Sequence, residues 1–338
     1  MSIKFLKGNM FDSKAEALVN TVNCEGYMGK GIAYQFKQRF PENDKKYVEK
    51  CRTGELRPGT ILCVSEGDRI IVNFPTKDKW REPSRIEYII DGLKSLKKEI
   101  EEHHIKSIAI PPLGCGNGGL LWDEVKKYIV NELQDVESDV YLYEPQGNGK
   151  AVKEQMMTAN DLMLLYVRQK LENATSLRFQ KTIFFVNYYV GKTVFSFSRG
   201  KYGPYSKQLY HEAVRIGEYQ KTKGFETADK TFDAIYQVIC SKKVDAEYSK
   251  LKLAADKALA LANKITDERM LEGMATVFYL INDEKHNGHD EIIKEFKNWS
   301  EDKAQRFKLE MIDQCIDMLD VNRFIDVDLF RNYTVVKA

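Results

Sequence analysis

The sequence predicts two domains, a three-layer α/β sandwich followed by a mostly α-helical domain. Strand-like and helix-like segments alternate over the first ~145 residues, whereas apolar residues at helical spacing dominate the remainder. A polar, glycine-rich run from Pro145 to Lys150 separates these two patterns. We therefore expect a first domain at residues 1–145, a linker at 146–154 and a second domain at 155–338.

The length of the chain and its balance of basic and acidic residues limit the kinds of function that are expected. The chain has 338 residues, with 52 Lys+Arg against 50 Asp+Glu, and each half is close to balanced. A protein that grips nucleic acid through many phosphates needs a strongly basic surface. Any contact with a polynucleotide is therefore expected to be local.

No targeting or disulfide signal is evident in the sequence. No apolar stretch approaches the ~20 residues that span a bilayer, and the first residues lack the apolar core of a signal peptide. The six cysteines are scattered without a Cys-x-x-Cys pair. We expect reduced thiols, a cytoplasmic location and no membrane contact.

The first domain is expected to have a mixed sheet with buried central strands. A capping box, Ser84 with Glu87, is predicted to open its clearest helix, and Pro41 is predicted to stop its first helix. Strands are predicted at residues 3–6, 17–22, 60–64, 69–74, 105–110 and 140–143, and helices at 32–40, 86–100 and 122–133.

The second domain is expected to be built mainly from helices. A β-like segment at 193–198 leads into a turn at 200–205. Helices are predicted at 162–171, 179–189, 207–215, 232–239, 248–265, 270–282, 290–299 and 304–319.

Two glycine-rich loops follow predicted strands of the first domain. One runs from Asn20 through Gly26 to Ala33, and the other runs from Pro111 to Leu120. Glycines before a helix leave backbone N–H groups unobstructed and direct the positive end of the helix dipole at an anion. Two such loops at the carboxyl ends of strands can clamp a diphosphate, although each can also be a simple tight turn.

Several ordered motifs in the first ~145 residues resemble a macrodomain, the ADP-ribose-binding module. They are Gly8-Asn9-Met10-Phe11, the strand end Asn20-Thr21-Val22-Asn23, Met28-Gly29-Lys30-Gly31-Ile32-Ala33, and Pro112-Leu113-Gly114-Cys115-Gly116-Asn117-Gly118-Gly119-Leu120. More narrowly, Asn73-Phe74-Pro75-Thr76-Lys77, followed by Trp80, resembles the DNA ADP-ribosyl glycohydrolase antitoxins of DarT/DarG toxin–antitoxin systems.

The resemblance implies a three-layer α/β macrodomain with a mixed sheet and an ADP-ribose site. It implies that Asn9 lies near the adenine, and that Asn20 and Asn23 lie near the distal ribose. The residues expected to bind ADP-ribose are Gly8, Asn9, Asn20, Thr21, Asn23, Gly29, Lys30, Gly31, Ile32, Ala33, Thr76, Gly114, Cys115, Gly116, Asn117 and Gly118.

Lys77 is the candidate catalytic residue. It follows a hydrophobic strand, so its amine is expected to face the same crevice as the loops, as nucleophile or as electrostatic partner of the anomeric carbon. The resemblance implies this role, since the related terminal ADP-ribose glycohydrolase also places a lysine after a Thr at this strand end. That relative adds an aspartate where this chain has Gly118, so a lysine–aspartate mechanism is not supported. Without the resemblance, Lys77 reads as a solvated lysine like Lys79.

Other catalytic and metal chemistries are not indicated. The first domain has only His103 and His104, so a Ser-His-Asp or Cys-His arrangement is not expected there. Cys115 lacks an evident base and is interpreted as a packing residue. The acidic run Glu99, Glu101 and Glu102 reads as a solvated helix face. His286 and His289 lack partners at ligand spacing, and we expect no metal and no cofactor.

The turn Arg199-Gly200-Lys201-Tyr202-Gly203-Pro204-Tyr205-Ser206 resembles the toxin-binding region of the same antitoxin family. The second domain is thus expected to bind and block a cognate DarT-like ADP-ribosyltransferase; the alternative for any one residue is a structural turn on an aromatic core.

The resemblance as a whole implies an antitoxin enzyme. It would remove ADP-ribose from ADP-ribosylated thymidine in single-stranded DNA and neutralise the transferase. Two alternatives stay open: a non-catalytic ADP-ribose reader, or a macrodomain hydrolase acting on ADP-ribosylated protein or O-acetyl-ADP-ribose.

Overall fold

The computed structural model describes residues 3–145 and 157–337, and its contacts divide the chain into two compact units. Unit 1 comprises Met1–Met157 and Lys221–Asp245, and unit 2 comprises Thr158–Gln220 and Ala246–Ala338. The linker expected at 146–154 lies outside the described residues. Residues 221–245, placed in the second domain by sequence, make their contacts within unit 1.

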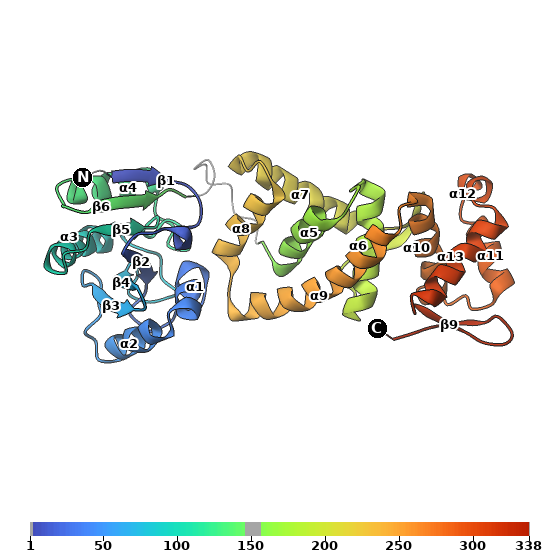
Figure 1. Ribbon diagram of the computed structural model, residues 1–338, viewed down its shortest axis with the longest axis horizontal. Coiled ribbons are helices and arrows are strands. Elements are labelled where there is room, and N and C mark those ends of the chain that lie inside the picture. Colours follow the sequence, from blue (N-terminus) through green and yellow to red (C-terminus); the bar gives the residue numbers. More distant parts are fainter. Residues whose placement is uncertain (1–2, 146–156, 338) are drawn as a thin grey trace. The chain divides into compact units, whose positions relative to one another are not determined.

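Unit 1 is built on a six-stranded mixed sheet with strand order β1-β6-β5-β2-β4-β3 (Figure 1). Only the pairing of β3 with β4 is antiparallel, and the other neighbours run parallel. This confirms the expected mixed sheet and its hairpin. The strands are β1 (Ile3–Leu6), β2 (Ala17–Val22), β3 (Leu62–Glu66), β4 (Arg69–Pro75), β5 (Ser107–Ile110) and β6 (Asp139–Tyr143).

Helices cover both faces of this sheet and make the three expected layers. Neighbouring residues of a strand alternate between two cores: Val19 and Val72 lie on one face, Leu18 and Ile71 on the other. The first face packs on α3 (Ile86–Glu102) and α4 (Trp122–Leu133). The second packs on the short 3-10 helix η1 (Met10–Asp12), α1 (Gly31–Arg39) and α2 (Pro41–Arg52). The central strands are thus buried on both faces.

Two local predictions for unit 1 differ from the structure. Pro41 ends one helix but also begins α2, which the sequence analysis did not predict; proline is well suited to the first helical position, where its missing N–H costs nothing. The predicted capping box of Ser84 and Glu87 is wrong, because Ser84 is not the N-cap of α3. Arg85 is the N-cap of α3 and makes no side-chain cap bond, and the buried Ser84 Oγ has no partner.

Unit 2 is mainly helical, as expected, and α10 is its central helix. Residues 271–281 of α10 are all buried, against α6, α11 and α13. The helices that lie wholly in unit 2 are α5 (Ala159–Lys170), α6 (Ser176–Val190), α10 (Glu268–Asn282), α11 (His289–Lys297), α12 (Glu301–Arg306) and α13 (Leu309–Val321). Most of α7 (Lys207–Lys223) and α9 (Lys242–Lys264) also lies in unit 2, while α8 (Ala228–Ile239) belongs to unit 1.

Three features of unit 2 depart from the prediction. The single helix expected at 304–319 is two helices, because buried Phe307 adopts an extended conformation between α12 and α13. The β-like segment forms only β7 (Ser198–Gly200), paired with β8 (Gly203–Tyr205). A further hairpin, β9 (Ile325–Val327) with β10 (Tyr333–Val335), was not predicted.

Two further expectations concern the cysteines and membrane-spanning helices. All six cysteines are free thiols. Within residues 3–145 and 157–337, no helix has both the length and the apolar character needed to cross a membrane.

Candidate active site

The two glycine-rich loops and the end of β4 meet at one edge of the sheet in unit 1. Lys77 Nζ, just after β4, donates a hydrogen bond of 2.8 Å to the backbone carbonyl of Asn117 in the second loop. A Cβ placed on Gly31, in the first loop, would lie 3.2 Å from Asn117 Nδ2. The structure therefore brings together three segments that the sequence analysis assigned to one site.

Asn23 holds the first loop in shape. Its Oδ1 accepts hydrogen bonds from the backbone N–H of Glu25 (2.9 Å) and from the Tyr47 hydroxyl (3.2 Å). Its Nδ2 donates to the backbone carbonyl of Tyr27 at 2.7 Å. The Asn23 side chain, predicted to lie near the distal ribose, is thus mostly used to fold the loop from 23 to 27.

A chain of buried asparagines supports the loop from below. Asn20 Nδ2 donates to Asn73 Oδ1 at 3.0 Å, and Asn73 Nδ2 donates to Asn43 Oδ1 at 2.6 Å. All three side chains are buried, and Asn20 Oδ1 has no hydrogen-bond partner. Asn20, expected near the distal ribose, joins β2 to β4 beneath the loop, and its contact with a ribose stays a prediction. Asn43 was not among the predicted site residues, because an asparagine in a polar helix carries no distinctive sequence signal.

The N-terminus of α1 provides backbone N–H donors. One of these donors is already hydrogen-bonded to the segment 221–245 of unit 1. Gly31 N–H donates to the carbonyl of Cys240 at 3.0 Å, just after α8, and Tyr34 donates its hydroxyl proton to Asp245 Oδ2 at 2.8 Å. Lys30 is the N-cap but makes no side-chain cap bond. The amides of Ile32 and Ala33, in the first turn, are therefore the better placed donors for an anion.

The second loop is closely packed at one glycine and open at another. A Cβ on Gly118 would lie 2.2 Å from Ser84 Oγ and 2.3 Å from the carbonyl oxygen of Gly114, so no side chain fits there. Gly116 has no neighbour within 4 Å of a would-be Cβ. Gly114 has a φ of +70°, which favours glycine. The missing carboxylate at Gly118 is therefore enforced by packing.

Lys77 is half-buried, and backbone bonds fix the segment that carries it. The N–H of Thr76 donates to the carbonyl of Val22 at 3.0 Å, and Cys24 N–H donates to the carbonyl of Asp78 at 2.9 Å. Burial lowers the pKa of the Lys77 amine below its ordinary value of 10.5. A larger share of this amine is thus uncharged near neutral pH than of a solvated lysine.

The two cysteines of the site are protonated thiols. Burial raises the pKa of Cys115 to about 12, and burial, with the carboxylate of Asp78 as a second cause, raises that of Cys24 to about 12. Nucleophilic cysteines need a lowered pKa. Cys115 Sγ donates to the carbonyl of Leu113 at 3.3 Å, which agrees with the packing role expected for it.

Two exposed aromatic rings flank the first loop and the end of β4. The side chains of Tyr27 and Trp80 are 61% and 48% exposed, and their ring centroids are 6.3 Å apart. The guanidinium of Arg81 lies 4.7 Å from the Trp80 ring centre. The Glu25 carboxylate accepts a 2.8 Å hydrogen bond from the backbone N–H of Trp80, which ties the two segments together.

Asn9, expected near the adenine, caps a short helix. Its Oδ1 accepts a hydrogen bond of 3.1 Å from the backbone N–H of Phe11, and Gly8 has a φ of +120°. The other predicted site residues lie on the same segments of unit 1: Thr21 on β2, Gly29 and Lys30 before α1, and Thr76 after β4. Ligand contacts of the predicted set stay predictions.

One group of possible metal ligands occurs in the described part of the chain. Ligand atoms of Cys63, Glu99 and His103 all lie within 4.8 Å of one another, on β3 and at the end of α3. The Cys63 thiol has its pKa raised to about 12, by burial first and then by Glu99, so it is not a thiolate. None of these residues belongs to the three segments of the site.

Comparisons with known proteins show which family this chain is similar to. The Macro domain family matches residues 19–129. The chain is 36% identical over 320 residues to a DNA ADP-ribosyl glycohydrolase of Thermus aquaticus, covering 89% of each chain. It is 31% identical over 163 residues to a DNA ADP-ribosyl transferase–DNA ADP-ribosyl glycohydrolase fusion protein of Thermosipho africanus, covering 43% of this chain and 42% of that one. Among solved structures, the macrodomain of Thermus aquaticus DarG is 49% identical, with 43% of this chain and 99% of that chain covered and a TM-score of 0.42.

Proposed function

This chain belongs to the DarG family of DNA ADP-ribosyl glycohydrolases, and from that premise we propose that unit 1 removes ADP-ribose from ADP-ribosylated thymidine in single-stranded DNA. The observation that carries the proposal is the meeting of Lys77, Asn117 and Gly31 at one edge of the sheet. The backbone donors of two glycine loops suit a diphosphate, and the adjacent amine suits the sugar carbon beyond it.

The charge distribution fits a substrate held by its ADP-ribosyl group. The site offers backbone N–H groups and small residues for binding, and the net charge of the chain is only +2. The exposed rings of Tyr27 and Trp80 offer faces on which an unpaired base can stack, worth about 1–3 kcal/mol per base. Single-stranded DNA suits this surface, because its bases are free to stack.

Lys77 acts at the anomeric carbon of the distal ribose. As a nucleophile, the uncharged amine forms a bond from Nζ to this carbon while the carbon–nitrogen bond to thymine breaks. The bonding electrons stay on the base, which takes up a proton. The ribose ring of the adduct then opens as the nitrogen loses its proton, which gives an imine that borohydride can reduce, and water hydrolyses this imine to ADP-ribose and the free amine. As an electrostatic partner, the protonated amine would instead stabilise charge without forming a bond. The carbonyl of Asn117 orients the amine in either role.

The Lys77→Ala variant tests this function. Turnover of an ADP-ribosylated oligonucleotide should fall by about 10²–10⁴-fold, whereas ADP-ribose affinity should stay within about threefold, because the backbone cradle remains. Lys79→Ala is the matched control: its side chain is 62% exposed and paired with Glu82, and it should turn over normally. Unchanged turnover in Lys77→Ala would remove the lysine from the mechanism.

A Lys77→Arg variant separates the two roles of the amine. Arginine keeps the positive charge but is not a nucleophile at accessible pH. Loss of turnover in this variant, together with a covalent adduct trapped by borohydride in the wild type, would assign nucleophilic catalysis. Retained turnover without an adduct would assign the electrostatic role.

We also propose that unit 2 binds and neutralises a cognate DNA ADP-ribosyltransferase toxin. The related fusion protein of Thermosipho africanus carries a DNA ADP-ribosyl transferase and a glycohydrolase in one chain, which supports such a pairing. The full-length chain, with Lys77→Ala to silence hydrolysis, should bind the purified transferase and block DNA modification. Failure to bind would overturn the antitoxin role and leave the hydrolase standing.

A side-by-side substrate assay distinguishes the reaction from neighbouring activities. The full-length chain should release ADP-ribose from modified single-stranded DNA far faster than from modified protein, and should not deacetylate O-acetyl-ADP-ribose at a comparable rate. Faster turnover of protein or of the acetyl ester would contradict the proposed substrate.

A further inference from the structure

Unit 2 contains a cavity of about 680 Å³ that the hydrolase chemistry does not use. This volume falls within the range of sites that bind ligands or side chains of partners. We call it the Lys181 pocket. It is lined by Ser176, Leu177, Gln180 and Lys181 of α6, by Gly200, Lys201, Tyr202, Gly203 and Tyr205 of the β7–β8 hairpin, by Glu268, Arg269 and Glu272 of α10, and by Arg306.

A buried lysine forms part of its wall. Lys181 is 2% exposed, and its Nζ donates to the carbonyl of Pro204 at 2.8 Å. An ammonium group has three N–H donors. In the described part of the chain, Pro204 is the one acceptor within hydrogen-bond distance of Lys181, so this buried cation is poorly compensated.

The acidic group nearest to this lysine is already paired. Glu272 is 2% exposed; its Oε1 accepts a 2.7 Å bond from Lys303 Nζ, and both of its oxygens accept bonds from the Arg306 guanidinium, at 2.9 and 3.0 Å. Its negative charge is therefore shared by two cations. The remaining charged side chains of the lining are Lys201, Arg269 and Glu268, which leaves the pocket with an excess of positive charge.

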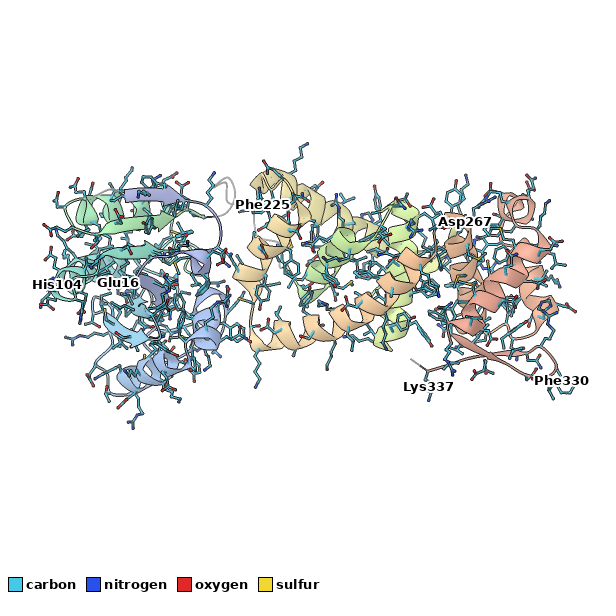
Figure 2. The ribbon with its side chains drawn as sticks, viewed as in Figure 1. Glu16, His104, Phe225, Asp267, Phe330 and Lys337 are labelled. Atoms are coloured by element: carbon cyan, nitrogen blue, oxygen red, sulfur yellow. The ribbon has the colours of Figure 1, made fainter. Side chains whose placement is uncertain are left out.

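Two helices also begin at the pocket. Ser176 and Leu177 lie in the first turn of α6, and Glu268 and Arg269 lie in the first turn of α10. Figure 2 labels Asp267, the N-cap residue of α10. The Asp267 carboxylate already caps α10, whereas α6 is capped by the neutral hydroxyl of Thr175. The positive end of the α6 dipole therefore adds to the side-chain cations, and the pocket favours a negatively charged group.

The rim combines an aromatic ring with two cations. The side chain of Tyr202 is 44% exposed, and Lys201 Nζ and the Arg306 guanidinium lie 5.1 and 5.4 Å from its ring centre. Tyrosine and arginine are enriched among the residues that carry most of the energy of protein–protein interfaces.

We propose that the Lys181 pocket receives an acidic side chain, aspartate or glutamate, from the transferase toxin. This inference rests on the toxin-binding role proposed above and names the surface and the charge that serve it. Even without a charge on Lys181, the cations Lys201, Arg269 and Arg306 outnumber the two carboxylates of the lining, so one further carboxylate is favoured. The several charges of a polyphosphate would meet Glu268 and Glu272. Tyr202 and Tyr205 supply apolar walls for the rest of an inserted segment.

Charge reversal at the exposed rim tests the inference without disturbing the buried network. Lys201 and Arg269 are both exposed, and an acidic residue is favourable in the first turn of α10, so Lys201→Glu/Arg269→Glu should fold. In the full-length chain this double variant should bind the purified transferase at least tenfold more weakly than the wild type. Its binding should also depend less steeply on salt.

The matched control reverses two lysines outside the lining. Lys250→Glu/Lys297→Glu makes the same change in charge at exposed positions of unit 2 and should bind within about threefold of the wild type. Denaturant unfolding followed by far-ultraviolet circular dichroism, which is dominated by the helices of unit 2, reports that each variant is folded. The Lys181→Met variant tests the buried wall of the Lys181 pocket, and it should also bind the transferase at least tenfold more weakly than the wild type.

The outcomes separate this inference from the antitoxin role. Wild-type binding with an unaffected Lys201→Glu/Arg269→Glu variant would overturn the pocket and leave toxin binding in place. Equal losses in the test and control variants would also overturn it, by showing only an effect of net charge. Loss of oligonucleotide binding, with toxin binding unchanged, would assign the pocket to nucleic acid instead. No binding by the wild type would overturn the antitoxin role itself.

Discussion

The candidate active site of unit 1 and the Lys181 pocket of unit 2 each contain a lysine whose pKa is lowered by burial, but their surroundings differ. Lys77 is half-buried among glycines and backbone carbonyls, and its amine bonds to the carbonyl of Asn117. Lys181 is almost fully buried, beside the network of Glu272, Lys303 and Arg306. The first arrangement directs an amine at the crevice between the glycine loops, whereas the second places a buried amine beside the cations Arg306 and Lys303.

The largest expected difference between the units concerns buried charge. Glu272→Ala leaves the fully buried Lys303 without its carboxylate, which should destabilise unit 2 by about 3–5 kcal/mol. In unit 1, Glu144→Ala breaks a partly exposed pair with Lys126 and should cost no more than about 1 kcal/mol. Hydrogen exchange resolved by segment would measure both. Equal losses of unfolding free energy in the two variants would show that the buried network of Glu272, Lys303 and Arg306 stabilises unit 2 no more than a partly exposed ion pair stabilises unit 1.

The pH dependence of stability sharpens the same comparison at Lys181. Burial, with a further contribution from Lys303, lowers its pKa to about 7 in the folded chain, against the ordinary value of 10.5 for lysine. The unfolded chain therefore binds more protons between pH 7 and 10.5, so the unfavourable free energy of holding Lys181 charged is fully present below pH 7, and the stability of the folded chain rises as pH increases through this window.

Lys181→Met removes this penalty. The variant should gain stability relative to the wild type below pH 7, and this gain should fall by roughly 1 kcal/mol per pH unit towards pH 10. Denaturant unfolding of both proteins at several pH values measures the difference. A difference that is independent of pH would show that Lys181 keeps an ordinary pKa.

The two glycines of the second loop provide a contrast within unit 1. Gly118→Ala places a Cβ against Ser84 and the carbonyl of Gly114, and should weaken ADP-ribose binding by about tenfold or more because the loop must shift. Gly116→Ala meets open space and should stay within about threefold. Calorimetric titration with ADP-ribose compares them, and equal affinities would mean that the loop tolerates a side chain at either position.

The smallest expected effect is in the pH profile of catalysis. Because burial lowers the pKa of Lys77, a nucleophilic amine should make kcat/KM rise with pH and level off below 10.5, the ordinary value for lysine. Rates measured on an ADP-ribosylated oligonucleotide would show the profile. A rise that continues to pH 10.5 would contradict the lowered pKa.

The sequence predicted most of unit 1 because its signals are local. Short apolar runs predicted β2 and β4, and the spacing of isoleucines and leucines predicted α3. Its three site segments could be assigned together because parallel strands end at the same edge of the sheet. The bond between Lys77 and Asn117 joins residues 40 positions apart, which no local pattern specifies.

Other features depend on tertiary packing and were not predicted. Ser84 does not cap α3, because the N-cap position is Arg85, one residue later than predicted. The Ser84 side chain packs against Gly118 instead. Segment 221–245 joins unit 1 through Cys240 and Asp245, although its sequence is helical like its neighbours. The Lys181 pocket combines four separate segments, and a lysine in an aromatic helix gives no sign of being buried.

The position of the Lys77 amine relative to bound substrate tests the central claim most directly. A crystal structure of the Lys77-containing chain with ADP-ribose should place Nζ about 3–3.5 Å from the anomeric carbon of the distal ribose, with the diphosphate between the two glycine loops. A structure in which the nucleotide occupies the loops while Nζ points into solvent, beyond reach of that carbon, would contradict the account.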